Sequence, residues 1–215
     1  MYSMFVKGGP AMWPLLIVSI IAMTTVIERA LFAWKQKKKR QPELVRTILR
    51  RVEQGKIEEA IVLGRHAQDP VARMLVHGLL HRDRALSGAL LHSASKELKP
   101  YQRGLTALDT AVTLSPLLGL FGTVTGMIRA FGMLGGQQLD APTAITGGIA
   151  EALIATAFGL CIAILALVPL NLLNSYYERT KEEIEQAATE LEVLLAQQTQ
   201  THTHAPESYE DPIHA

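Results

Sequence analysis

Three long stretches without a formal charge determine most of what this chain of 215 residues can fold into. They run from Ala11 to Ile27, from Thr110 to Ile128 and from Ala152 to Tyr177. A helix needs about 20 mainly apolar residues to cross the hydrocarbon core of a bilayer. The first stretch reaches that length if its helix continues past Glu28 and Arg29 to Trp34. The sequence therefore predicts an all-α membrane protein with three transmembrane helices.

The first stretch is expected to stay in the protein as an anchor and not to be removed as a signal peptide. Lys7 is the only basic residue before it, and no small-residue cleavage site follows. A basic run comes next instead, formed by Lys35, Lys37, Lys38, Lys39 and Arg40. Basic residues beside a span remain in the cytoplasm. Nucleic-acid binding is the alternative for this run, but topology and contact with anionic lipid suit its position better.

The same rule orients the whole chain. Residues 35–105 carry 16 Lys and Arg against 7 Asp and Glu, whereas residues 132–150 contain no Lys or Arg. We therefore expect the N-terminus outside and the C-terminus inside. The predicted segments are an outer N-terminal segment 1–10, transmembrane helix 11–34, cytoplasmic helical loop 35–105, transmembrane helix 106–134, outer periplasmic loop 135–146, transmembrane helix 147–177, cytoplasmic C-terminal helix 178–198 and disordered tail 199–215.

Helical spacing of apolar residues marks the cytoplasmic segments. Gly55 is expected to form a turn between two helices, and Asp69 before Pro70 to cap a third. The second and third spans are expected to extend as long helices into the cytoplasm. In the polar tail, His202 and His204 form only a weak candidate metal site.

Small residues follow one face of each of the last two spans. Close packing of small residues, more than apolar burial, brings helices together in lipid. The glycines expected to mediate this packing are Gly119, Gly122, Gly126, Gly148 and Gly159. The single cysteine, Cys161, is expected to be a small buried apolar side chain.

Glu151 is the only charged residue between Ala141 and Tyr177. A carboxylate within a span tends to face a protein interior or a watery cavity. Glu151 is therefore either a pore-facing acid or a residue at an interfacial helix start. Thr156 lies about 140° away from it around the helix, so the two side chains do not both point squarely at one axis.

Recognisable catalytic patterns are lacking in the sequence. We find no P-loop, dinucleotide fingerprint, zinc pattern or nucleophile–base motif. An enzyme is therefore not expected, nor is a cofactor.

Two segments, "SPLLGLFGTVTGMIRAF" at 115–131 and "GGIAEALIATAFGLCIAILALVP" at 147–169, resemble the signature helices of the ExbB/TolQ/MotA proton-channel family. The three-span plan and "IERA" at 27–30 resemble ExbB first and TolQ next, more than the four-span MotA. Thr125 departs from the family pattern, which has a bulkier residue at this position.

The resemblance implies a homopentameric ring in the bacterial inner membrane. A one-span, ExbD-like partner sits in the pore of such a ring and carries an aspartate that takes up the proton. Proton flow then energises a TonB-like protein. By matching motif, Thr123, Glu151 and Thr156 correspond to residues of the proton pathway.

Three alternatives remain open. One is a TolQ-like subunit that powers a TolA-like envelope system. Another is a membrane scaffold that conducts no ions and is sensitive only to bulk at Gly122 or Gly126. The third is a flagellar-type stator, for which Arg46, Arg50 and Arg51 offer a charged cytoplasmic face.

Overall fold

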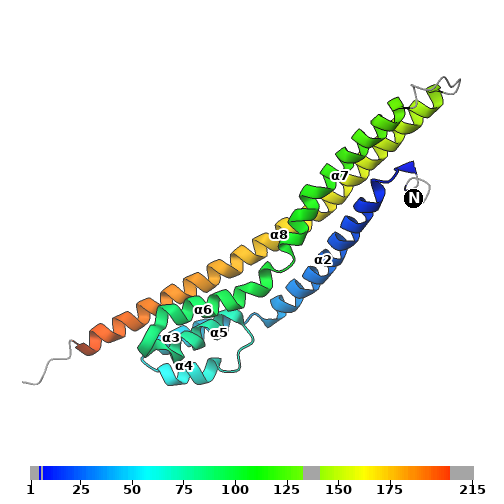
Figure 1. The fold of residues 1–215 in the computed structure, drawn as a ribbon. Helices are drawn as coiled ribbons and strands as arrows, with labels where there is room; N and C mark the ends of the chain where they lie inside the picture. The colour runs from blue at the N-terminus through cyan, green and yellow to red at the C-terminus, as the bar shows by residue number, and fades with distance from the viewer. Residues whose placement is uncertain (1–4, 6, 133–140, 204–215) are drawn as a thin grey trace, which may run out of the picture. The chain divides into compact units, whose positions relative to one another are not determined.

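The structure is a computed structural model that describes residue 5, residues 7–132 and residues 141–203. Within these residues the chain forms seven helices and no strand (Figure 1). They are α2 (Met12–Lys39), α3 (Pro42–Glu53), α4 (Ile57–Gly64), α5 (Pro70–Leu80), α6 (Arg82–Gln102), α7 (Leu105–Gly132) and α8 (Ala141–Thr203).

The chain divides into two compact units. The first, which we call the span unit, comprises residues 1–35 and 102–177. The second, the polar unit, comprises residues 36–101 and 178–215. Helices α2 and α8 contribute residues to both units.

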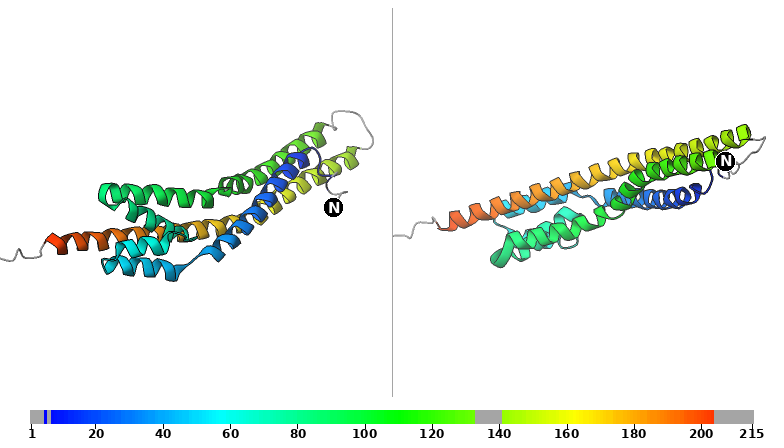
Figure 2. Two further views of the ribbon diagram at one scale, coloured as in Figure 1. Left: turned by 90° about the horizontal axis from the view of Figure 1, so that it is seen from below. Right: turned by 45° about the horizontal axis from the view of Figure 1, so that its top comes forward.

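Three helices long and apolar enough to cross a membrane supply the span unit, namely α2, α7 and the first part of α8. The 28 residues of α7 extend for about 42 Å, which exceeds the roughly 30 Å of a hydrocarbon core. Its inner side packs through Leu108 and Ala111 against Ala22 of α2 and against Ala166 and Leu170 of α8. Both views of Figure 2 show α7 running along the first part of α8.

The predicted boundaries of the third span and of the tail differ from the structure. Helix α8 begins at Ala141, inside the expected outer loop, and continues without a break to Thr203. The expected disorder from residue 199 is therefore wrong for residues 199–203. The preceding turn is held in place because Gln198 donates a hydrogen bond to the Val52 carbonyl oxygen, and an established helix extends more easily than a new one begins. The expectations for residues 1–4, 133–140 and 204–215 lie outside the described residues.

The polar unit is a small helical bundle (Figure 1). Helices α3, α4, α5 and α6 pack together with the later part of α8, and their apolar sides form one core. Its most deeply buried side chains include Ile48, Val52, Met74, Leu79, Ile184 and Leu191. The predicted turn is present, since Gly55 has a φ of 74° between α3 and α4.

Asp69 caps α5, as the sequence predicted, and also binds the chain segment just before α3. Its side chain is 1% exposed. Oδ1 accepts the backbone N–H of Val71 at 2.8 Å, and Oδ2 accepts that of Gln41 at 2.7 Å. The Nε atom of Arg40 lies 3.7 Å from Oδ2. One buried carboxylate therefore joins the start of α5 to the chain just before α3.

We expect Asp69→Ala to destabilise the polar unit by about 3 kcal/mol, because it removes an N-cap and a second charge-assisted hydrogen bond. The measurement is amide hydrogen exchange of the full chain in detergent, which should speed up at Val71 and Gln41. Glu182→Ala, at an exposed carboxylate of α8, is the control. Unchanged exchange at both amides in Asp69→Ala would contradict this account.

Candidate functional site

The five predicted packing glycines all lie buried where α7 meets α8. A Cβ added to Gly159 would lie 2.5 Å from the Ser115 carbonyl oxygen and 3.1 Å from the Gly119 Cα. A Cβ added to Gly148 would lie 2.7 Å from the Cβ of Ala130. Added Cβ atoms on Gly119, Gly122 and Gly126 would likewise come within 3.1 Å of α8. Since real Cβ atoms rarely approach so closely, the two backbones touch only because side chains are missing.

Thr156 bridges the two helices. Its hydroxyl donates to the Gly119 carbonyl oxygen across the contact at 3.0 Å, and its side chain is half-buried. An interhelical bond of this kind stabilises a membrane helix pair by roughly 0.6 kcal/mol on average. Close approach at Gly119 is what brings this carbonyl oxygen within reach of a threonine on the other helix.

Thr123 is placed differently. Its hydroxyl donates to the Leu120 carbonyl oxygen of its own helix at 2.6 Å, and its side chain is half-buried. Thr125 bonds to its own helix in the same way, to the Phe121 carbonyl oxygen at 3.0 Å. A hydroxyl that donates to its own helix keeps its oxygen lone pairs available to water or to a partner.

Glu151 forms an ion pair with Arg129, the charged residue that directly follows the second uncharged stretch. The Nη1 atom of Arg129 donates to Oε1 of Glu151 at 2.7 Å. The two side chains are 45% and 23% exposed, so the carboxylate is the more deeply placed partner. A carboxylate paired with a guanidinium is much less costly within a span than an isolated one. The pair joins α7 to α8.

The start of the chain covers the same carboxylate. Gly9 has a φ of 69°, and a Cβ added there would overlap the Glu151 carboxylate. Gly8 is buried, and a Cβ on it would lie 3.2 Å from Ile154 of α8. The absence of side chains at both positions lets the segment before α2 lie directly against Glu151.

Glu151 does not lie at a helix start, because α8 already begins at Ala141, so that part of the interfacial interpretation is wrong. Glu151 and Thr156 do face different neighbours, as their separation around the helix predicted. Glu151 contacts Arg129, and Thr156 contacts the Gly119 carbonyl. Cys161 differs from expectation in being exposed, since it lies on a side of α8 turned away from the other helices of the chain.

The basic run divides into two kinds of residue. Lys35, Lys37, Lys38 and Lys39 are exposed at the end of α2. Arg40 is only 22% exposed and contacts both Asp69 and Glu183. Its expected role in lipid contact is corrected to a structural one, because two carboxylates of the polar unit take up its guanidinium.

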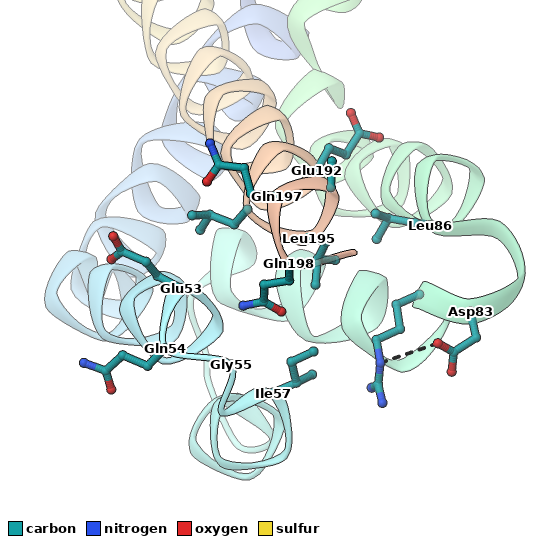
Figure 3. A pocket seen from close by; sticks show the side chains of 13 residues that line it. Glu53, Gln54, Gly55, Ile57, Asp83, Leu86, Glu192, Leu195, Gln197 and Gln198 are labelled. Carbon is teal, nitrogen blue, oxygen red and sulfur yellow. Dashed lines mark ion pairs between the residues drawn. The ribbon is translucent and has the colours of Figure 1, made fainter. Parts of the chain in front are cut away.

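A cavity of about 830 Å³ opens on the polar unit (Figure 3). Carboxylates of Glu53, Asp83 and Glu192 surround apolar side chains that include Leu86 and Leu195. Arg82, the only cation among its lining residues, lies 3.7 Å from Asp83 and 3.4 Å from Glu58. Among the described residues, no group of three or more His, Cys, Asp and Glu side chains is arranged to hold a metal ion. The side chains of His202 and His204 lie outside those that the structure describes.

Comparison with known proteins agrees with the resemblance noted from the sequence. A sequence model of the MotA/TolQ/ExbB proton channel family matches residues 66–186, which is more than half of the chain. The chain belongs to the MotA/TolQ/ExbB proton channel family. It is therefore a membrane protein of a proton-channel family, and its glycine contact and its Glu151–Arg129 pair lie within the region that defines this family.

Individual relatives carry both ExbB and TolQ names. Two putative ExbB-like biopolymer transport proteins of Synechocystis are 36% and 35% identical to the chain, covering 88% and 87% of it and 77% and 91% of their own lengths. The TolQ protein of the Tol-Pal system of Haemophilus influenzae is 35% identical over 48% of the chain and 46% of its own length. ExbB of Neisseria gonorrhoeae is 35% identical over 50% of the chain and 49% of its own length.

Proposed function

We propose that this chain is the ring-forming subunit of an inner-membrane proton channel, which uses the proton gradient to energise a TonB-like protein for transport across the outer membrane. The observation that carries the proposal is the α7–α8 contact. There Glu151 and Thr156 hold polar groups between two mainly apolar helices. Polar and ionisable groups within spans typically mark ion pathways.

The subunits are proposed to assemble as a homopentamer around a one-span, ExbD-like partner. Large apolar side chains remain exposed on the span unit, among them Trp13, Ile20, Leu117, Phe121, Leu153 and Leu165. Such surfaces suit lipid and neighbouring membrane helices. The N-terminus is placed in the periplasm and the C-terminus in the cytoplasm, on the basis of the exposed lysines after the first span. No covalent chemistry is assigned to the chain.

A TolQ-like role in a TolA-powered envelope system is the second candidate. It is favoured by the match to a TolQ protein, which covers about half of the chain. The ExbB-like role is preferred because the relatives with ExbB-like names match far more of the chain.

The test is proton flux into liposomes that contain the purified chain, with and without its one-span partner. A pH-sensitive dye inside the liposomes reports the flux. We expect flux that requires the partner. A well-formed ring that carries no flux in either preparation would contradict the proposal and favour a membrane scaffold.

A further inference from the structure

One face of α7 is polar at the start of the helix and apolar further along. Thr106, Asp109, Thr110 and Thr113 recur at intervals of three and four residues, so they share one side of the helix. All four are exposed. We call them the hydroxyl–carboxylate face. Beyond it the same side continues with Leu117 and Leu120, which are 60% and 56% exposed.

The hydroxyl–carboxylate face is turned away from the other two spans of its own chain. The residues that pack against α2 and α8 are Leu108 and Ala111, and Ser115 is also fully buried. Thr110 and Thr113 continue this face past Asp109 into the uncharged stretch, and both are exposed. Exposed hydroxyls suit water or another protein surface better than lipid, so we expect one of these in front of the face.

The hydrogen bonds of this face leave acceptors pointing outward. Thr110 donates to the Thr106 carbonyl oxygen at 2.8 Å, and Thr113 to the Asp109 carbonyl oxygen at 3.0 Å. Each hydroxyl oxygen keeps its lone pairs for a water molecule. The Asp109 carboxylate has no hydrogen-bond or ion-pair partner within the part of the chain that the structure describes. Its oxygens are thus available to water.

The position of Asp109 along α7 places it near one end of the membrane-spanning part of the helix. Asp109 and Arg129 are separated by 20 residues of one helix, or about 30 Å, which matches the thickness of a hydrocarbon core. Arg129 then lies near one membrane surface, and Asp109 near the other. With the basic run in the cytoplasm, the Asp109 side is the cytoplasmic one.

We infer that the hydroxyl–carboxylate face lines the cytoplasmic end of the proton path, and that Asp109 is the group that passes the proton to cytoplasmic water. An O–H bond forms on a carboxylate oxygen as an O–H bond of a hydronium ion in the path breaks, which leaves a neutral water molecule. The bond then breaks toward water on the cytoplasmic side, so Asp109 is unchanged after each transfer. The proton transfer by Asp109 rests on the proposed function. The hydration of the hydroxyl–carboxylate face rests only on the surface of α7.

Hydration of the hydroxyl–carboxylate face is tested by cysteine labelling. The variants are made in a Cys161→Ala background and labelled in inside-out vesicles. Thr113→Cys is compared with Leu114→Cys, its neighbour at nearly the same depth, which is also exposed. The reagent is a membrane-impermeant thiosulfonate, which reacts with the thiolate. Because the thiolate forms in water and not in lipid, we expect Thr113→Cys to be labelled at least ~10 times faster than Leu114→Cys. Equal labelling at the two positions would overturn the hydrated face, whether or not the ring conducts protons.

The role of Asp109 in proton transfer is tested by measuring proton flux into liposomes that contain the ring and its partner. We expect Asp109→Asn to lower the flux strongly, Asp109→Glu to retain it, and Glu182→Gln, at an exposed carboxylate outside the spans, to leave it unchanged. Full flux in Asp109→Asn would overturn the role of Asp109. If even the wild-type chain carries no flux, the proposed function and the proton role fail together, while the labelling result still decides whether the face is hydrated.

Discussion

Gly159→Ala is expected to separate α7 from α8 and to destabilise the span unit by about 1–3 kcal/mol, the usual cost of overpacking a tight contact. The new Cβ would lie 2.5 Å from the Ser115 carbonyl oxygen and 3.2 Å from the Gly119 nitrogen. Both are backbone atoms, so no side-chain rotation relieves the clash. Gly159→Leu should prevent ring assembly altogether. Thermal unfolding in detergent, followed by circular dichroism, measures the first effect, and size-exclusion chromatography measures the second.

Gly147→Ala provides the matched control, since a Cβ at that position meets no atom within 4 Å. Alanine is favoured over glycine within a helix by about 1 kcal/mol, so this variant should be neutral or slightly stabilised. Equal unfolding temperatures for Gly147→Ala and Gly159→Ala would show that the glycine contact does not limit stability.

Glu151→Ala and Thr156→Val are each expected to abolish partner-dependent proton flux while the ring still forms. The first removes the only carboxylate between residues 141 and 177 and leaves Arg129 without its partner. The second preserves the shape of the side chain but removes the hydroxyl that donates to Gly119. The lost hydrogen bond should cost only about 0.6–1.7 kcal/mol, so assembly should survive. Flux is measured in liposomes, and ring formation by native mass spectrometry.

Two substitutions separate the function of Thr156 from its packing. Thr156→Ser keeps a hydroxyl at the helix contact and should retain flux. Thr125→Val removes a hydroxyl that bonds only to its own helix and should leave flux unchanged. Full flux in both Glu151→Ala and Thr156→Val would contradict their roles in the pathway and favour the scaffold alternative.

Much of the fold follows from local patterns in the sequence. The three apolar stretches predict three helices long enough to cross a membrane, and the structure has them. The Gly55 turn and the Asp69 cap were also predicted, because each depends on a few neighbouring residues. The spacing of the glycines around the helices predicted a close contact, and the structure places that contact between α7 and α8.

The ion pairs could not be predicted in the same way. Whether Arg129 meets Glu151 depends on how two antiparallel helices align, and the glycine contact sets that alignment. A signal was nevertheless present, since Arg129 ends one span and Glu151 comes early in the next. Arg40 shows the same difficulty, because its partner Glu183 lies far away in sequence. The extension of the third span past Tyr177 as a helix was expected, and α8 has it. What the sequence did not indicate is where this helix begins and ends, because residues 141–146 and 199–203 carry no strong helical pattern.

The exposed leucines of α7 affect how easily protons would leak along this helix when no partner is bound. Between Thr113 and Thr123, the outward side of the helix offers Leu117 and Leu120 over a rise of about 15 Å. Hydrogen-bonded oxygens lie about 2.8 Å apart, so several water molecules would have to line up along an apolar wall to carry a proton across. We therefore expect the proposed ring to be an insulator without its partner, so that a cell that makes the subunit in excess keeps its membrane potential.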